Sequence, residues 1–335
     1  MKRYKPLGDI PVSVLELAVI GVDITTKETL NNSLNLAQHV EALGYRRFWV
    51  AEHHNMPYIA SSATAVLIGY LAQGTTTLRV GSGGIMLPNH APLVIAEQFG
   101  TLESLYPNRI DLGLGRAPGT DGLTAMALRR THDLSANYFP EQVAELQGFF
   151  SKNNADAKVR AFPGDGLEVP LWILGSSTDS AHLAAKLGLP YAFASHFAPE
   201  QIQMASQIYK SEFQPSDKWE EPYFMACVNA MIADTEEEAN RLATSLYNMF
   251  LGIIRNDRRP MQKPVDSMDG LWSEQEENMV YQKLACTFIG TKDSVKPDLQ
   301  RFCDVLEIDE LMITSPIYDH QARLKSFSLF KQAVS

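Results

Sequence analysis

Short apolar runs alternate along the chain with longer segments whose apolar residues recur at helical spacing. The apolar runs are rich in β-branched and aromatic residues and are short enough to be buried strands. They predict strands at residues 12–19, 46–53, 78–87, 109–116, 170–176, 191–196, 223–233 and 310–315. The segments between them predict helices at residues 26–43, 62–73, 91–105, 140–150, 179–187, 199–213 and 235–254, with a final pair flanking the last strand.

The alternation of strand and helix determines the fold class that we expect. Repeated strand–helix units build parallel sheets, because each crossover helix returns the chain to the same edge. Eight such units in one chain are typical of a sheet that closes on itself, so we predict an α/β protein with a (β/α)8 TIM barrel. Residues 1–335 would then form a single barrel domain.

The connection between the seventh and eighth predicted strands is longer than the others. Its stretch from residue 255 to 273 contains Pro260 and Pro264 among charged residues and has little apolar period. Such a composition is typical of a loop. We therefore expect residues 255–273 to be a loop inserted into the barrel between strands 7 and 8.

Composition and charge exclude several classes of function. Lys and Arg number 29 and Asp and Glu number 39, which gives a formal net charge of -10. An acidic chain binds the phosphate backbone poorly, so we expect no nucleic-acid partner. Residues 65–72, the longest apolar stretch, are too few to span a membrane, and Pro11 and Glu16 interrupt the first apolar run, unlike a secretion signal. The three scattered cysteines indicate no disulfide framework, and a cytoplasmic location fits best.

Three predicted strands end in glycine and small hydroxyl residues. The sequences are GSGG at 81–84, GLGR at 113–116 and GSST at 175–178. Ligands of such barrels bind where the strands end. Small residues there leave room for a flat ligand and expose N–H groups that bind an anion, and Arg116 adds a positively charged fork. Glycines at strand ends are also ordinary turn residues, so a structural role stays open.

Two other enzyme motifs are incomplete in this sequence. Gly113, Gly115 and Gly119 resemble a dinucleotide-binding fingerprint, but the third glycine comes one position late and Pro118 interrupts the expected helix start. The G-x-S-x-G elbow of serine hydrolases does not occur.

The second predicted strand runs out into Glu52, His53 and His54, and His90 follows the third. These residue types bind metals, but neighbouring residues of a strand point to opposite faces, so at most one histidine of the pair would face the barrel mouth. HxH and HExxH spacings are absent. We therefore expect no metal site, and a structural core histidine is an alternative for one of the pair.

Five sequence strings, in this order, resemble the bacterial luciferase-like flavin-dependent monooxygenase family. They are VAEHH (50–54), VGSGGIMLPNHAP (80–92), RIDLGLGR (109–116), WILGSS (172–177) and AAKLGLP (184–190). The resemblance covers nearly the whole chain. It implies a (β/α)8 barrel that binds FMN, usually reduced and delivered by a separate NAD(P)H:flavin reductase. Such a protein inserts one oxygen atom of O2 into a small organic substrate.

The resemblance also assigns roles to individual residues. Gly83 and Gly84, which follow Ser82 at a cofactor-binding strand end, occupy the place of the family's non-prolyl cis peptide beneath the flavin ring. His53 matches the active-site histidine, and either it or the adjacent His54 would face the flavin.

A second group of residues matches the family's phosphate site. This group comprises Arg116, the strand end Gly175 and the hydroxyls of Ser176, Ser177 and Ser180. The helix that begins after Gly175 independently favours an anion there. Residues 255–273 lie where the family keeps a mobile lid, which would shield the reacting flavin from water.

The sequence departs from the light-emitting members of the family and leaves other functions open. Gly115 stands where those members carry a reactive cysteine, so we do not expect bioluminescence. An F420-dependent hydride-transfer enzyme, as in a sister branch of the family, is one alternative, and a flavin-binding protein without catalysis is another. We expect FMN rather than F420, and a homodimer.

Overall fold

Nine parallel strands form the sheet of the computed structural model, which describes residues 5–129 and 138–335. They are β1 (Val12–Glu16), β2 (Arg47–Val50), β3 (Arg79–Met86), β4 (Ile110–Gly115), β5 (Leu171–Gly175), β6 (Tyr191–Phe193), β7 (Phe224–Ile232), β8 (Thr287–Gly290) and β9 (Glu310–Thr314). Strands β1 to β7 pair in sequence order, β7 pairs with β9, and β9 pairs with β1. Eight strands therefore close a barrel, which confirms the predicted TIM fold.

β8 is the strand that the apolar pattern did not predict. It pairs with residues 229–232 of β7, whereas β6 and β9 pair with β7 nearer its start. β8 is thus an added strand outside the closed ring. Its four residues are too few to show a period, and three of them are only partly buried. The last predicted strand corresponds to β9.

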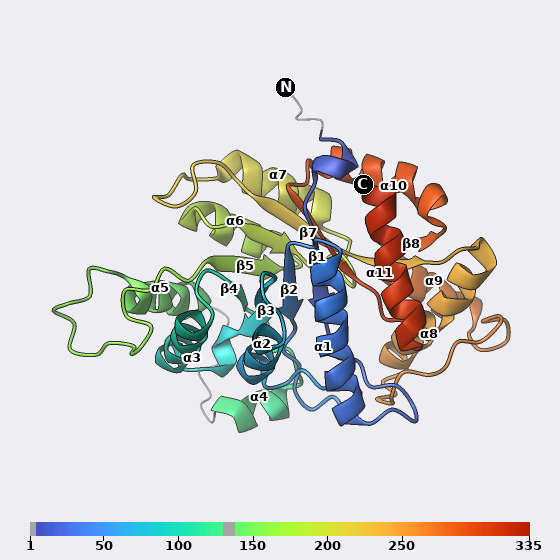
Figure 1. Ribbon diagram of the computed structural model, residues 1–335, viewed down its shortest axis with the longest axis horizontal. Helices are drawn as coiled ribbons and strands as arrows, with labels where there is room; N and C mark the ends of the chain where they lie inside the picture. Colours follow the sequence, from blue (N-terminus) through green and yellow to red (C-terminus); the bar gives the residue numbers. More distant parts are fainter. Residues whose placement is uncertain (1–4, 130–137) are drawn as a thin grey trace.

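Helices cover the outside of the barrel (Figure 1). They are α1 (Thr26–Ala42), α2 (Thr64–Gln73), α3 (Pro92–Leu105), α4 (Gly122–Arg129), α5 (Phe139–Phe150), α6 (Thr178–Leu187), α7 (Ile202–Glu212), α8 (Glu236–Ile254), α9 (Glu274–Lys283), α10 (Lys292–Leu306) and α11 (His320–Val334), with short 3-10 turns η1 (Leu7–Asp9) and η2 (Leu87–Asn89). The sequence did not predict α4 or α9, and in α9 only Val280 is buried. Across the described ranges, no helix is both long and apolar enough to cross a membrane.

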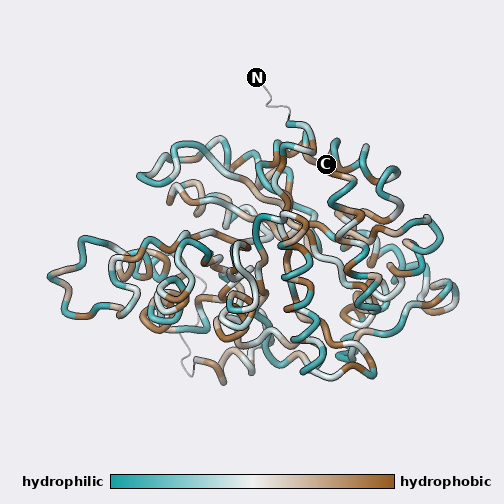
Figure 2. Tube along the Cα trace, viewed as in Figure 1, coloured by the Kyte–Doolittle hydropathy of each residue, from teal (hydrophilic) through white to brown (hydrophobic). Residues whose placement is uncertain are grey.

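Helix α1 illustrates how the sequence pattern determines an element. Thr25 caps its start by accepting a hydrogen bond from the backbone N–H of Glu28, at 3.2 Å. Leu36 and Val40 are fully buried on its inner side. The colour in Figure 2 alternates along this helix between hydrophobic and hydrophilic, as expected for a helix that packs one face on a barrel.

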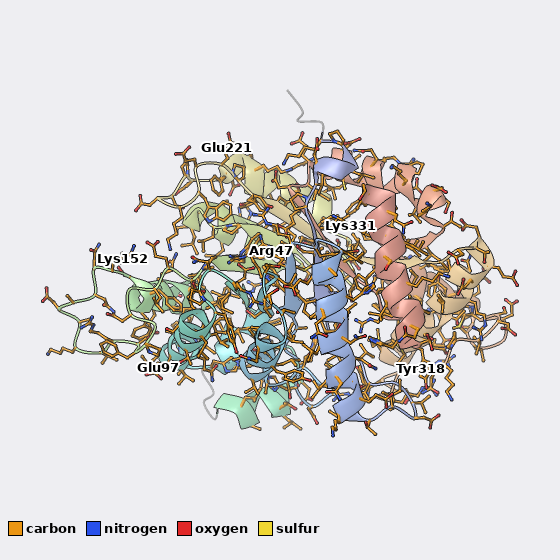
Figure 3. All side chains as sticks on the ribbon, viewed as in Figure 1. Arg47, Glu97, Lys152, Glu221, Tyr318 and Lys331 are labelled. Carbon is orange, nitrogen blue, oxygen red and sulfur yellow. The ribbon has the colours of Figure 1, made fainter. Side chains whose placement is uncertain are left out.

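The inside of the barrel is a packed core. The rings of Trp49 and Trp172 meet edge to face with centroids 5.1 Å apart. At the N-terminal end of the strands, Arg47 forms buried ion pairs with Asp111 and Glu310 at 2.8 and 2.7 Å. Figure 3 shows Arg47 near the centre of the molecule, whereas Lys152 and Glu221 lie at its periphery. Because the interior is filled, a ligand can reach the barrel only at an end of the strands.

Residues 255–273 connect α8 to α9 without forming a helix. The backbone N–H of Met261 donates to Ile20 O at 2.9 Å, beyond the end of β1. Arg258 donates to Asn55 O at 3.3 Å, beyond the end of β2, and lies 3.5 Å from Asp121, beyond β4. The inserted loop therefore contacts three of the segments that follow the C-terminal ends of barrel strands.

Candidate active site

The second strand ends earlier than its apolar run indicates. β2 stops at Val50, so Glu52, His53 and His54 lie in the segment that follows it. The alternation of faces along a strand does not apply there, and the side chains of the two histidines take independent directions. The sequence-based reason for separating them is therefore wrong.

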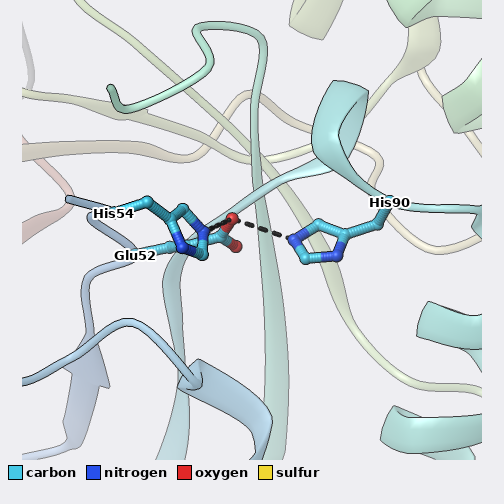
Figure 4. Close-up of side chains that lie close together, drawn as sticks. All are labelled: Glu52, His54 and His90. Atoms are coloured by element: carbon cyan, nitrogen blue, oxygen red, sulfur yellow. Dashed lines mark hydrogen bonds and ion pairs between the residues drawn. The ribbon is translucent and has the colours of Figure 1, made fainter. Parts of the chain in front are cut away.

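Glu52 is the centre of a small hydrogen-bonded group (Figure 4). Its side chain is 1% exposed, and Oε1 accepts from Nε2 of His54 at 2.9 Å and from Nε2 of His90 at 2.8 Å. Oε2 accepts from the backbone N–H of Met86 at 3.0 Å. Burial alone would raise the pKa of Glu52, but the hydrogen bonds from the two imidazoles and the backbone bring this pKa to about 2. The carboxylate is therefore charged, and it fixes the imidazole of His54.

His53 makes contacts different from those of His54. Its Nδ1 lies 3.4 Å from Gly119 O, and burial lowers the pKa of the imidazole. Burial and, to a smaller extent, a charge on His53 lower the pKa of His196 to about 3. His53 follows β2 and His196 follows β6, and these two strands stand on opposite sides of the eight-strand ring. The two histidines therefore approach each other across the C-terminal end of the barrel. Of the pair in the sequence, His54 is the one that hydrogen-bonds to Glu52, whereas His53 lies close enough to His196 for their charges to interact.

His196 is a residue that the sequence analysis missed. Its backbone O accepts from Nδ2 of Asn229 at 2.6 Å, which fixes the segment after β6. Its Nδ1 is buried and has no hydrogen-bond partner among the described residues. A buried acceptor or donor of this kind is satisfied when a ligand or water binds. The signal was present, since His196 is the last residue of a predicted strand.

The peptide bond between Gly83 and Gly84 is cis, at the place where the family resemblance implies one. A Cβ on Gly83 would come within 2.8 Å of Leu15, and one on Gly84 within 2.2 Å of Leu174. Only glycine allows this backbone to lie directly on the barrel core. The Ser82 hydroxyl is buried and donates to Gly113 O at 2.8 Å, so its side chain joins β3 to β4 and only its backbone can contact a cofactor.

Arg116 lies at the N-terminus of α6. Its Nη1 is 3.0 Å from Oδ2 of Asp179, in the first turn of that helix. Ser177 is the N-cap residue, and its hydroxyl makes no cap hydrogen bond. The guanidinium and the N-terminus of α6 therefore come together where β5 ends, and Ser176 and Ser177 form the turn between them. Helix N-termini bind anions because their first N–H groups lack intrahelical partners.

Ser180 and Gly175 shape this turn. The Ser180 hydroxyl is buried, donates to Ser177 O at 2.7 Å and lies 2.9 Å from the hydroxyl of Tyr191. A Cβ on Gly175 would come within 1.9 Å of the Ser180 oxygen. The close approach of strand end and helix requires glycine at this position. The Ser180 hydroxyl already has internal partners, whereas those of Ser176 and Ser177 remain at the partly exposed turn.

Comparisons with known proteins agree with this geometry. The family model for luciferase-like monooxygenases matches residues 10–304. A luciferase-like monooxygenase of Escherichia coli (strain K12) is 50% identical over 320 residues, which cover 96% of each chain. An N-acetyl-S-alkylcysteine monooxygenase of Bacillus subtilis (strain 168) is 33% identical, over 97% of this chain and 98% of that relative. The crystal structure of apo-MsnO8 has a TM-score of 0.87 at 30% identity and covers 97% of this chain and 98% of that one.

Proposed function

Because the chain belongs to the luciferase-like monooxygenase family, we propose that it is the oxygenase of a two-component system, which uses reduced FMN and O2 to oxygenate a small organic substrate. The observation that carries this proposal is the position of the Arg116 guanidinium, 3.0 Å from Asp179 in the first turn of α6, where a phosphate would meet a positive charge beside a helix N-terminus. The strand register supports the proposal, since Gly115 of β4, which precedes Arg116, pairs with Met86 of β3, two residues after the cis peptide.

The residues present fit FMN. A terminal phosphate takes one guanidinium, the N–H groups of one helix N-terminus and the hydroxyls of Ser176 and Ser177. The side-chain-free backbone of Gly83 and Gly84 offers a flat floor for the ring system. FAD carries a second phosphate and an adenosine, for which the barrel-mouth residues described above provide no second set of donors.

The protein contributes positioning, proton transfer and exclusion of water. When bound in its reduced form, FMN supplies two electrons to O2, so that one oxygen atom enters the substrate and the other leaves as water. His53 is uncharged at neutral pH because burial lowers its pKa, so one ring nitrogen holds a proton and the other accepts one. Glu52 fixes the segment that carries His53, and the loop at residues 255–273 covers strand ends from the solvent side.

Equilibrium dialysis against FMN, FAD, riboflavin and F420 tests the cofactor. We expect FMN to bind more tightly than FAD or F420. Tighter binding of F420 would favour hydride transfer without O2, and equal binding of FAD would contradict a site for one phosphate.

A turnover experiment tests catalysis separately. Reduced FMN is mixed with the protein, O2 and an N-acetyl-S-alkylcysteine, the substrate class in the name of the B. subtilis relative, alongside a panel of other small thioethers, ketones and amines. An oxygenase gives an oxygenated product and a matching decrease in hydrogen peroxide with one of them. Unchanged peroxide yield across the panel, with FMN bound, would favour a flavin-binding protein without catalysis.

A further inference from the structure

We propose that Glu52, His54 and His90 form a binding site for one divalent transition-metal ion such as Zn²⁺, Co²⁺ or Ni²⁺. Their three ligand atoms, one carboxylate oxygen and two imidazole nitrogens, lie within 4.8 Å of one another. Figure 4 shows the two rings meeting the carboxylate from opposite sides. This site does not depend on flavin binding, so it stands or falls separately from the proposed oxygenase function.

The spacing of the ligand atoms suits an ion with six ligands. With bonds of about 2.0–2.1 Å, adjacent ligands of an octahedron lie about 2.9 Å apart, whereas those of a tetrahedron lie about 3.4 Å apart. The distances from Glu52 Oε1 to Nε2 of His54 and His90 are 2.9 and 2.8 Å. They match two edges of an octahedron. Water completes the other positions from the solvent side, where the His54 and His90 side chains are 14% and 27% exposed.

The chemistry of the donors selects the class of ion. Two imidazoles with one carboxylate favour Zn²⁺, Co²⁺, Ni²⁺ and related ions, whereas Mg²⁺ and Ca²⁺ prefer oxygen ligands alone. The Glu52 carboxylate is buried and charged, and the N–H of Met86 holds its second oxygen. A hydrogen bond to the distant oxygen of a ligating carboxylate orients it toward the metal.

The three ligands come from two segments that the metal would join. Glu52 and His54 follow β2, and His90 follows η2 after β3. In the sequence these residues lack a metal-binding spacing, and the site exists because β2 and β3 are neighbours in the barrel. A bound ion would therefore link two strand ends beside the cis peptide and raise the resistance of this region to unfolding.

The test uses the full chain after treatment with a chelator, without flavin. Equilibrium dialysis with Zn²⁺ or Co²⁺ and metal analysis should give one ion per chain. In His90→Gln the amide N–H can still donate to Glu52, but the imidazole ligand is lost, so we expect affinity to fall at least tenfold. The matched control is His182→Gln, because His182 forms a single exposed pair with Glu212, at 2.6 Å, far along the chain from this group. It should leave the affinity unchanged.

Spectroscopy and thermal unfolding give independent readouts. Bound Co²⁺ should show the weak visible absorption of a six-ligand ion, and Zn²⁺ should raise the unfolding temperature of the native chain but not of His90→Gln or His54→Gln. Circular dichroism checks that these variants fold. Equal Zn²⁺ binding by the native chain and both variants, or competition by Mg²⁺ at concentrations similar to those of Zn²⁺, would overturn the proposal.

Discussion

At the scale of single residues, Glu52 shows how one buried carboxylate gives adjacent side chains different chemistry. It binds His54 and His90, whereas the imidazole of His53 contacts Gly119 O and lies close enough to His196 for their charges to interact. Two histidines that are indistinguishable in the sequence therefore serve separate purposes. One is fixed beside a charge, and the other is an uncharged ring at the proposed reaction site.

Arg116→Ala tests the phosphate site. Loss of a charge-assisted contact should weaken FMN binding by ~1.5–3 kcal/mol and leave riboflavin binding nearly unchanged, because riboflavin has no phosphate. Equilibrium dialysis with both ligands measures the difference. Arg301→Ala is the control, since Arg301 also forms an exposed ion pair with an aspartate, Asp298 on α10, and should change neither affinity. Equal weakening of both ligands in Arg116→Ala would show a structural role instead.

His196 should make the protein sensitive to acid. Burial lowers its pKa in the folded state to about 3, so between about pH 6.5 and pH 3 the unfolded chain binds a proton that the folded chain excludes. The contribution of the uncharged His196 to the free energy of unfolding is therefore complete above this pH window and decreases as the pH falls through it.

Replacing this imidazole should flatten the pH profile. Between pH 7 and pH 5 we expect the free energy of unfolding of the native chain to fall about 1–2 kcal/mol more than that of His196→Asn. Urea unfolding at both pH values gives these numbers. His182→Asn, at an exposed histidine, should keep the native slope, and a native slope in His196→Asn would contradict the assignment.

At the scale of elements, the turn between β5 and α6 is held in place by contacts within the protein. Gly175 lets Ser180 approach the strand end, and the Ser180 hydroxyl bonds to Ser177 O and Tyr191. These contacts hold the first turn of α6 against β5, so its N–H groups and Arg116 have defined positions before any ligand arrives. Such preorganisation lowers the cost of ordering the site on binding.

Gly175→Ala should disturb this junction. Its Cβ would overlap Ser180, so we expect a loss of ~1–3 kcal/mol in the free energy of unfolding from overpacking. FMN affinity should fall more than riboflavin affinity because the anion site shifts. Gly148→Ala, in α5 with nothing within 4 Å of the added Cβ, should instead stabilise the protein by ~0.5–1 kcal/mol. Urea unfolding and dialysis distinguish these outcomes. If Gly175→Ala lost stability but kept full affinity for FMN, this turn would not be part of the phosphate site.

At the scale of the whole molecule, the barrel separates stability from chemistry. The N-terminal end of the strands contains the buried ion pairs of Arg47, and the tryptophans fill the centre. The opposite end gathers His53, the cis peptide and Arg116. The described part of the chain forms one barrel.

Anaerobic mixing tests the proposed dependence on a flavin reductase. We expect the protein, mixed with FMN and NADH or NADPH, to leave the flavin oxidised, because the proposed mechanism takes its reduced flavin from a separate reductase. Addition of a catalytic amount of a flavin reductase to the same anaerobic mixture should then bleach the flavin absorbance. Rapid bleaching by the protein alone would show a self-sufficient oxidoreductase.

The sequence by itself determined the barrel and the main parts of its mouth. Parallel strands are buried on both faces and appear as apolar runs in the sequence. Each barrel strand can therefore be recognised from its own residues, and so can the order of the strands along the chain. Glycines and Arg116 at strand ends are also local, and they fall at the mouth because all strands of a parallel barrel end on the same side.

Tertiary structure alone decided how those residues are used. β8 is identified as a strand only by its pairing with residues 229–232 of β7. The direction of His53, its approach to His196 and the meeting of His54 with His90 depend on which strands are neighbours and which are opposite. The hydroxyls of Ser82 and Ser180 have internal partners that the sequence does not reveal. These contacts join residues far apart in the chain, and barrel closure and strand register, rather than any local period, set the distances between them.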